Sequence, residues 1–292
     1  VTSSQFRSIL KQCRNIVIIA TFDSDAAESR ILQNYFTPES REEMKKNPER
    51  FMLKREDVYA KGQLILYLFA QREEELMEHL EANREKLQAI FNERENEALK
   101  DKALASDALN KDLMRSVKAS HQVDMKIPTG YKVAEDTVYN TSEGEKGFMW
   151  LRDDEGKFDQ HLLISYRPYI SEAVFEDQNI VKWRNKLGKE YIYGDRKNKP
   201  DSYMITEDKV PVVFEAAQLD GQYAKEMRGL WRLNKVFWGG PFISYTVANP
   251  NTGRLYYLEG FLAAPGSNKR EKMRELELIL KSVAFGEKQG AQ

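Results

Sequence analysis

The sequence is poor in the residues that most often signal chemistry. It contains one cysteine, Cys13, and three histidines, His79, His121 and His161, among 292 residues. A single cysteine excludes an internal disulfide and a thiolate metal cluster. Because Cys13 precedes the apolar run 16–19, we expect a buried structural thiol. The histidines show no HExxH or HxH spacing, so the sequence predicts no metal site and no cofactor.

An excess of one charge and long apolar runs are also missing. The chain carries 45 basic and 46 acidic residues, a net charge of -1. This balance leaves no basic surplus to neutralise a phosphate backbone, so we predict no nucleic-acid binding. The longest apolar run, Leu64 to Ala70, is shorter than the roughly 20 residues that a bilayer crossing requires. The chain begins at Val1 without a signal peptide, so we expect a fragment or a processed product.

The motifs of common enzyme classes are absent as well. No GxGxxG, P-loop, GxSxG or kinase signature occurs. The pair Gly239-Gly240 lacks the following helix that a phosphate cradle needs. The acidic stretches 22–29 and 152–159 only begin the twelve-residue calcium loop and lack its closing glutamate. Turns and helix caps account for both stretches.

The apolar patterning predicts an α+β protein of two domains. The runs 14–22 and 62–70 are typical of strands that are covered on both faces. A long helical stretch with an apolar stripe follows the second run. Pro128 and Gly130 then mark a change to short strands and turns, which places a domain boundary near residue 122. We therefore expect an N-terminal α/β domain with a long helix, residues 1–121, and a C-terminal α+β domain, residues 122–292.

The C-terminal domain is predicted to be an antiparallel sheet of hairpins packed by two helices. Asp220-Gly221 favours a two-residue hairpin turn, because both positions tolerate positive φ. A second hairpin is expected around the loop 249–253. The helices are predicted over 176–187 and 267–283, where apolar residues recur at helical spacing.

The hairpin register yields the best catalytic candidates, Glu215, Glu226 and Arg228. It places the two carboxylates opposite one another on one sheet face, with the arginine nearby. Paired carboxylates can raise one pKa and serve acid–base hydrolysis. The alternative is a solvent-facing strand surface on which Arg228 reduces the repulsion. We favour this second interpretation, since structural ion networks also bring charges together.

The binding candidates come from the stretch 229–247, which holds five aromatic residues. Aromatic residues at such positions are more often core or cross-strand partners than ligand platforms. We therefore interpret the stretch as sheet interior and expect the glycines to let the chain turn between strands. A pocket is the alternative, because glycine permits close backbone approach. Its candidate residues are Trp231, Trp238, Gly239 and Gly240.

Four stretches of the second half carry a family resemblance. They are "KWRNKLGKEYI", "DSYMITED", "EMRGLWRLNKVFWGGPFISYTV" and "YYLEGFLAAPGSNKREKMRELELIL". Together they resemble domain of unknown function 4837, an uncharacterised family from Bacteroidota. The strand "CRNIVII" and the helix after "GQLILYLFA" are similar to that family's first half.

The resemblance implies a compartment rather than a chemistry. Members of the family look like envelope lipoproteins with a lipidated cysteine ahead of the folded part, so membrane contact is expected only through an anchor that this chain lacks. An upstream strand is also expected to be missing. No functional residue is implied. The favoured hypothesis is a non-enzymatic module that binds an envelope ligand or a protein partner, and the alternative is a hydrolase that uses Glu215 and Glu226.

Overall fold

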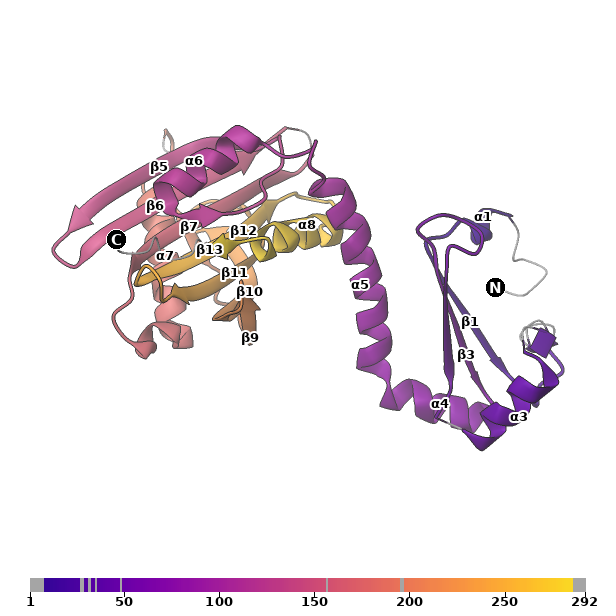
Figure 1. The fold of residues 1–292 in the computed structure, drawn as a ribbon. Helices are drawn as coiled ribbons and strands as arrows, with labels where there is room; N and C mark the ends of the chain where they lie inside the picture. Colours follow the sequence, from indigo (N-terminus) through magenta and orange to yellow (C-terminus); the bar gives the residue numbers. More distant parts are fainter. Residues whose placement is uncertain are drawn as a thin grey trace. The chain divides into compact units, whose positions relative to one another are not determined.

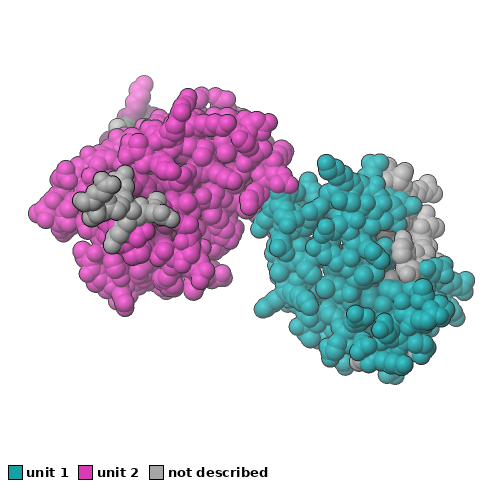
Figure 2. Space-filling view, viewed as in Figure 1, with its two compact units in different colours: residues 1–98 teal, residues 99–292 magenta. Residues whose placement is uncertain are grey.

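The chain forms two compact units, residues 1–98 and 99–292, in a computed structural model (Figures 1 and 2). It describes residues 8–26, 29–30, 33–34, 36–47, 49–155, 157–194 and 197–285. The boundary lies before the position near residue 122 that the sequence suggested. The difference has a physical reason: the helix over Lys111–His121 buries Leu113 and Val117 in the core of the second unit.

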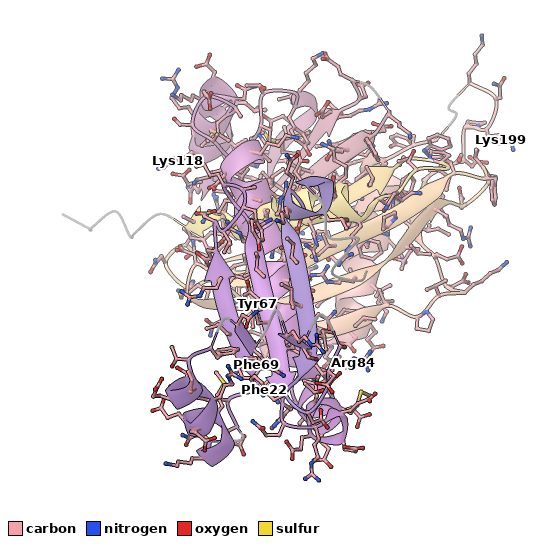
Figure 3. The ribbon with its side chains drawn as sticks, turned by 90° about the vertical axis from the view of Figure 1, so that its right-hand side faces the viewer. Phe22, Tyr67, Phe69, Arg84, Lys118 and Lys199 are labelled. Carbon is pink, nitrogen blue, oxygen red and sulfur yellow. The ribbon has the colours of Figure 1, made fainter. Side chains whose placement is uncertain are left out.

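The first unit contains a three-stranded sheet in the order β1-β3-β2. The central strand β3 pairs parallel with β1 and antiparallel with β2. Phe22 and Phe69 lie side by side at one end of the sheet (Figure 3), with ring centroids 5.9 Å apart. The elements are α1 (Ser8–Lys11), β1 (Asn15–Thr21), α3 (Pro38–Lys46), β2 (Met52–Glu56), β3 (Leu64–Ala70), α4 (Glu73–Ala82) and most of α5 (Arg84–Ala103), whose last residues belong to the second unit.

Two expectations for this unit are wrong. β3 is buried along its whole length, but β1 leaves Val17 and Ile19 exposed, because it lies at the edge of the sheet and only its other face meets the core. Cys13 is exposed rather than buried. It lies in the turn that follows α1, where its backbone N–H donates to Leu10, and the buried part of β1 starts only at Ile16.

The second unit is built on an eight-stranded antiparallel sheet, so the α+β class is correct. The strand order is β5-β6-β7-β12-β11-β10-β8, and β9 pairs with β10 as well. The short strands β4 (Val123–Asp124) and β13 (Ala284–Phe285) pair separately. The eight strands are β5 (Lys132–Thr141), β6 (Gly144–Asp153), β7 (Asp159–Pro168), β8 (Met204–Thr206), β9 (Val213–Leu219), β10 (Gln222–Leu233), β11 (Gly239–Asn249) and β12 (Arg254–Ala263).

Helices cover both faces of this sheet (Figure 1). α6 (Lys111–His121) and α8 (Arg270–Lys281) pack on one face, where Leu276 and Ile279 join the same core cluster as Tyr245. α7 (Asp177–Tyr191) packs on the other face, preceded by the 3-10 turn η2 (Glu172–Phe175). There Ile180 and Trp183 join a second cluster. Alternate side chains of each strand enter the two clusters, as the period of a β-strand requires.

Candidate functional site

The second unit has a cleft of 960 Å³ where β10 ends and β11 begins. The connecting turn, residues 234–238, forms part of its wall. Phe237, at the turn, is fully exposed, and Trp238 beside it is 42% exposed. Trp231 lines the cleft from β10 but is itself buried. Aromatic side chains are enriched at binding surfaces relative to the rest of a protein surface. Two exposed aromatic rings beside a cleft are therefore typical of a binding site.

The two glycines shape this cleft in a way that differs from our expectation. Gly239 and Gly240 do not make the turn; they are the first residues of β11 and pair with Arg232 and Trp231. Neither has a positive φ. A Cβ atom on Gly240 would lie 1.9 Å from the carbonyl oxygen of Leu262. The glycines therefore allow close approach between neighbouring strands, which is the role that the pocket alternative required.

A row of rings across the sheet holds Trp231 in place. The indole Nε1 of Trp231 donates a hydrogen bond to the carbonyl oxygen of Leu262, 3.2 Å away. Its ring meets Phe261 edge-on, with centroids 5.2 Å apart. Phe261 in turn stacks on His161 at 4.2 Å. Edge-to-face and offset stacked pairs of this kind favour one fixed arrangement.

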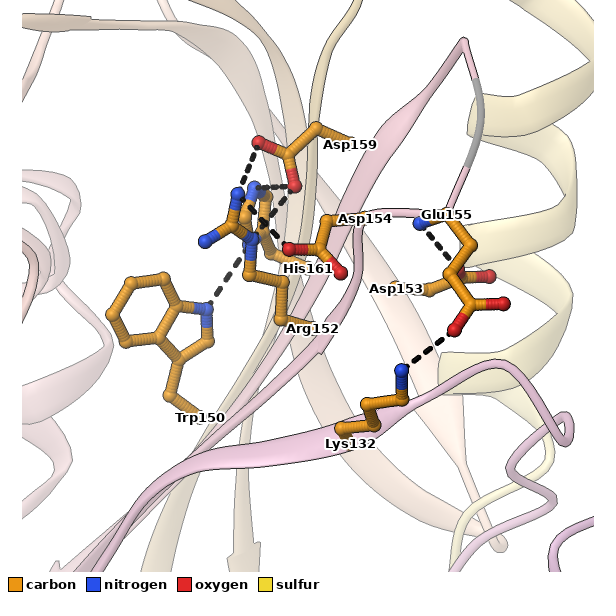
Figure 4. A network of polar contacts seen from close by, with 8 residues as sticks. All are labelled: Lys132, Trp150, Arg152, Asp153, Asp154, Glu155, Asp159 and His161. Carbon is orange, nitrogen blue, oxygen red and sulfur yellow. Dashed lines mark hydrogen bonds and ion pairs between the residues drawn. The ribbon is translucent and has the colours of Figure 1, made fainter.

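His161 ends this row in a polar network (Figure 4). The indole Nε1 of Trp150 donates to Nδ1 of His161 over 3.1 Å, and Nε2 lies 3.1 Å from Oδ1 of Asp159. Asp159 also accepts from Arg152, over 3.0 and 3.2 Å. Because Nδ1 accepts, the proton of the neutral ring sits on Nε2, which donates to Asp159. Burial lowers the pKa of His161, although Asp159 acts in the opposite direction.

The charges around the cleft are only partly neutralised. Arg232 pairs with Glu207 at 3.1 Å, and Lys235 pairs with Asp201 at 3.1 Å. Lys209 and Lys269 also line the cleft, and the structure records no ion pair of either with a described residue. The Nζ of Lys269 donates to the carbonyl of Ser267 over 3.1 Å. Apolar rings with unpaired cations beside them suit a ligand that combines an apolar part with negative charge.

The carboxylate candidates have a different environment. Glu215 and Glu226 are paired in the β9–β10 register, but Glu215 is exposed and Glu226 is 6% exposed. Glu226 accepts from Arg228 and, over 2.7 Å, from the hydroxyl of Tyr245. Arg228 also reaches Glu277 of α8, 3.0 Å away. These bonds connect the sheet to α8, and none of the three candidates lines the cleft described above.

A second buried charge cluster lies on the α7 face, and sequence reasoning missed it. Arg184 of α7 donates to Oε1 of Glu259 over 2.8 Å and to Oγ1 of Thr206 over 3.1 Å. Its guanidinium also lies 3.9 Å from the ring centre of Phe242. Both charged side chains are fully buried. The residues are far apart in the sequence, so no local pattern could have revealed the pair.

Two further findings concern the described part of the chain. No group of three or more His, Cys, Asp or Glu side chains among the described residues is placed to hold a metal ion. No helix among them combines the length and the hydropathy that a bilayer crossing requires.

Comparisons with known proteins address the family. A domain of unknown function, DUF8532, matches residues 1–103. A second domain of unknown function, DUF4837, matches residues 110–282. The two matches meet between residues 103 and 110, close to the boundary of the compact units and before residue 122. No curated protein matches the chain. The second match contains the cleft, its aromatic row and the helices on both faces of the sheet. Because it covers more than half of the sequence, it shows that the chain belongs to the DUF4837 family.

Proposed function

We propose that the protein is a non-enzymatic binding module whose ligand or protein partner occupies the cleft beside Trp231 and Trp238. The observation that carries this proposal is the full exposure of Phe237 next to a 960 Å³ cleft with an aromatic wall. Exposing such a ring to water costs free energy that a partner would recover, since aromatic anchors supply much of the energy of many interfaces.

The rigidity of the cleft wall supports the same proposal. Trp231 is fixed by a hydrogen bond and by an edge-on ring contact, so the wall is largely preformed. A preformed site loses less side-chain freedom when its ligand binds. Phe237 and Trp238, in contrast, lie at a turn where they can adapt to a partner's surface.

We also propose that the protein works in the cell envelope, lipid-anchored in its full-length form. This part of the proposal is supported by the resemblance of the sequence to envelope lipoproteins alone.

The alternative, a hydrolase that uses Glu215 and Glu226, has less support. Glu226 is buried, and its carboxylate already accepts hydrogen bonds from Arg228 and Tyr245. A general acid or base must reach a substrate proton within hydrogen-bond distance. Only Glu215 is exposed, and the two residues do not line the cleft.

Photo-crosslinking in the native envelope tests the binding proposal. A benzophenone amino acid replaces Phe237 in one variant and Tyr223 in a control. Tyr223 is also an exposed aromatic residue of the second unit, but it does not line the cleft. We expect a discrete adduct from position 237 that is absent from position 223, and its mass tells a protein partner from a small ligand. Identical adducts at both positions, or none at 237, would contradict the proposal.

A further inference from the structure

A second cleft, of 350 Å³, lies between the end of β7 and α7. Three of its lining side chains are cationic: Arg167 from β7, and Lys182 and Lys186 from α7. No lining residue is acidic. The rest of the wall combines the polar residues Ser171 and Asn179 with apolar ones. The apolar part includes Trp183 and also Ile170, which is 80% exposed. This cleft is distinct from the one at Trp238, and the two share no lining residue.

Arg167 is held in the cleft by contact with an aromatic ring. Its guanidinium lies over the ring of Trp183, 4.1 Å from the ring centre. Among the described residues, no hydrogen bond or ion pair of its side chain is recorded. Burial lowers the pKa of Arg167, an effect that the charge of Glu143 opposes. Glu143 itself is bound to Lys146 at 2.7 Å. A partly desolvated cation without a partner costs free energy that a bound anion would offset.

The two lysines add to this unbalanced charge. Lys182 and Lys186 are one helical turn apart on α7, so their charges repel each other. Each is exposed, and neither forms an ion pair with any residue that the structure describes. The acidic residue at the start of α7, Asp177, is paired with Lys225 of β10 instead. The chain as a whole has almost no net charge, so a cleft with three cations and no carboxylate departs from its average surface.

We propose that this cleft binds a phosphate group that carries an apolar substituent. The planar guanidinium of Arg167 suits phosphate oxygens, and two ammonium groups can approach the same anion from α7. The cleft volume of 350 Å³ is more than ten times the roughly 30 Å³ that a water molecule occupies in the liquid. The cleft therefore has room for a phosphate group and a substituent on it. Trp183 and Ile170 provide an apolar surface for the rest of the ligand. This inference is independent of the ligand proposed for the first cleft.

The position of Trp183 makes the proposal testable. The chain has four tryptophans, and Trp183 lines only the second of the two clefts. In protein labelled with 5-fluorotryptophan, titration with inorganic phosphate and then with phenyl phosphate, whose ring is apolar, should shift the fluorine resonance of Trp183. The resonance of Trp238 should stay in place, so failure here is separable from failure of the proposed function. Added salt should weaken the effect, because the cations are partly exposed.

A matched pair of variants on one helix supplies the control. Lys186→Gln removes a lining cation and should weaken the interaction by about tenfold, since a charge-assisted hydrogen bond contributes about 1.5 kcal/mol or more. Lys189→Gln removes the same charge from an exposed position of α7 that does not line the cleft. This variant should bind phosphate with an affinity within about twofold of the wild type, because an exposed charge outside the cleft contributes little. Equal losses in both variants would overturn the proposal.

The phosphate can come from a soluble ester or from a lipid headgroup, and a second arm separates these sources. Vesicles of phosphatidylglycerol are compared with vesicles of phosphatidylcholine by sedimentation. Binding of the soluble ester that depends on Lys186 identifies a soluble ligand. Binding only to phosphatidylglycerol vesicles, again lost in Lys186→Gln, identifies a headgroup. If the soluble ester does not shift the fluorine resonance of Trp183 and the vesicles do not sediment the protein, the cleft does not bind phosphate and the inference is wrong.

Discussion

The indole nitrogen of Trp231 on β10 lies 3.2 Å from the carbonyl oxygen of Leu262 on β12, although β11 runs between these two strands. The contact is possible because β11 has Gly240 at the position opposite Trp231. The ring can therefore cross the neighbouring strand without meeting a side chain. This arrangement gives the first cleft its wall, and it links the cleft to the ring row that ends at His161.

The first prediction concerns Gly240. The substitution Gly240→Ala places a Cβ atom 1.9 Å from the carbonyl oxygen of Leu262, and 3.3 Å from Nε1 of Trp231. The first contact is with backbone, which cannot move aside cheaply. We expect a loss of about 1–3 kcal/mol or more in the free energy of unfolding, the range of overpacked sites. Urea denaturation measures the loss, and the fluorescence of Trp231 should change with it.

A glycine with open space around it provides the comparison. Gly253, in the β11–β12 turn, has φ +66° and no atom within 4 Å of an added Cβ. Asparagine tolerates this left-handed conformation, so Gly253→Asn should cost well below 1 kcal/mol. If the Gly240 variant were as stable as the Gly253 variant, close approach would not be the reason for glycine at position 240.

A second prediction separates Glu226 from Glu215. Glu226→Gln weakens charge-assisted bonds in a buried site and should cost about 1.5–3 kcal/mol of stability. Glu215→Gln changes an exposed strand position and should stay within about 0.5 kcal/mol. Denaturation curves of the two variants test the structural role. Equal stability combined with loss of a measured hydrolytic activity in both would favour the enzyme alternative instead.

A third prediction follows from the buried histidine of the ring row. Burial places the folded-state pKa of His161 below the ordinary value of 6.5, so the unfolded chain binds its proton more readily. The contribution of neutral His161 to the free energy of unfolding is therefore fully present above about pH 6.5. It is lost as the pH falls toward the folded-state pKa. Protonation of Nδ1 would also end its bond to Trp150.

Unfolding experiments between about pH 7.5 and pH 5.5 measure this effect. His161→Gln should reduce the slope of stability against pH relative to the wild type. Burial also lowers the pKa of His121, although its contact with Asp136 acts in the opposite direction. His121 should therefore account for part of the slope that remains in the His161 variant. An unchanged slope in the His161 variant would show that its protonation is not linked to folding.

A fourth prediction concerns the buried pair of Arg184 and Glu259. Arg184→Leu leaves the carboxylate buried without its charged partner, and we expect a cost of about 3–5 kcal/mol. Adding Glu259→Gln removes the buried charge while keeping an acceptor for the hydroxyl of Tyr257. The double variant should regain at least half of the lost stability. Strictly additive losses would mean that the two groups do not interact.

The sequence predicts best where the signal is local. The α+β class follows from strand and helix periodicities, and the Asp220-Gly221 turn from residues that tolerate positive φ, here +48° and +73°. The candidates Trp231, Trp238, Gly239 and Gly240 all line one cleft, but the exposure that makes it a cleft was not predictable. Whether an aromatic residue next to a turn is buried depends on strands far away in the chain.

Contacts between distant elements account for what was missed. Arg184 of α7 and Glu259 of β12 come together only when the helix packs on the sheet. The same holds for the cleft that Arg167 of β7 lines together with Lys182 and Lys186 of α7. The compact units divide after residue 98, ahead of the boundary near residue 122 that the sequence suggested. The apolar face of the helix at Lys111–His121 is visible in the sequence, but the core that it covers is not.

The most direct test of the central claim is fluorine NMR of the protein labelled with 5-fluorotryptophan, titrated with soluble peptidoglycan fragments and with envelope lipids in vesicles. Its four tryptophans report on separate places: Trp150 beside His161, Trp183 at the second cleft, and Trp231 with Trp238 at the first. The account predicts that at least one probe shifts the Trp231 and Trp238 resonances and leaves Trp150 unchanged, and that Phe237→Ala weakens this response. Probes that bind the protein but leave the Trp231 and Trp238 resonances unchanged would contradict it.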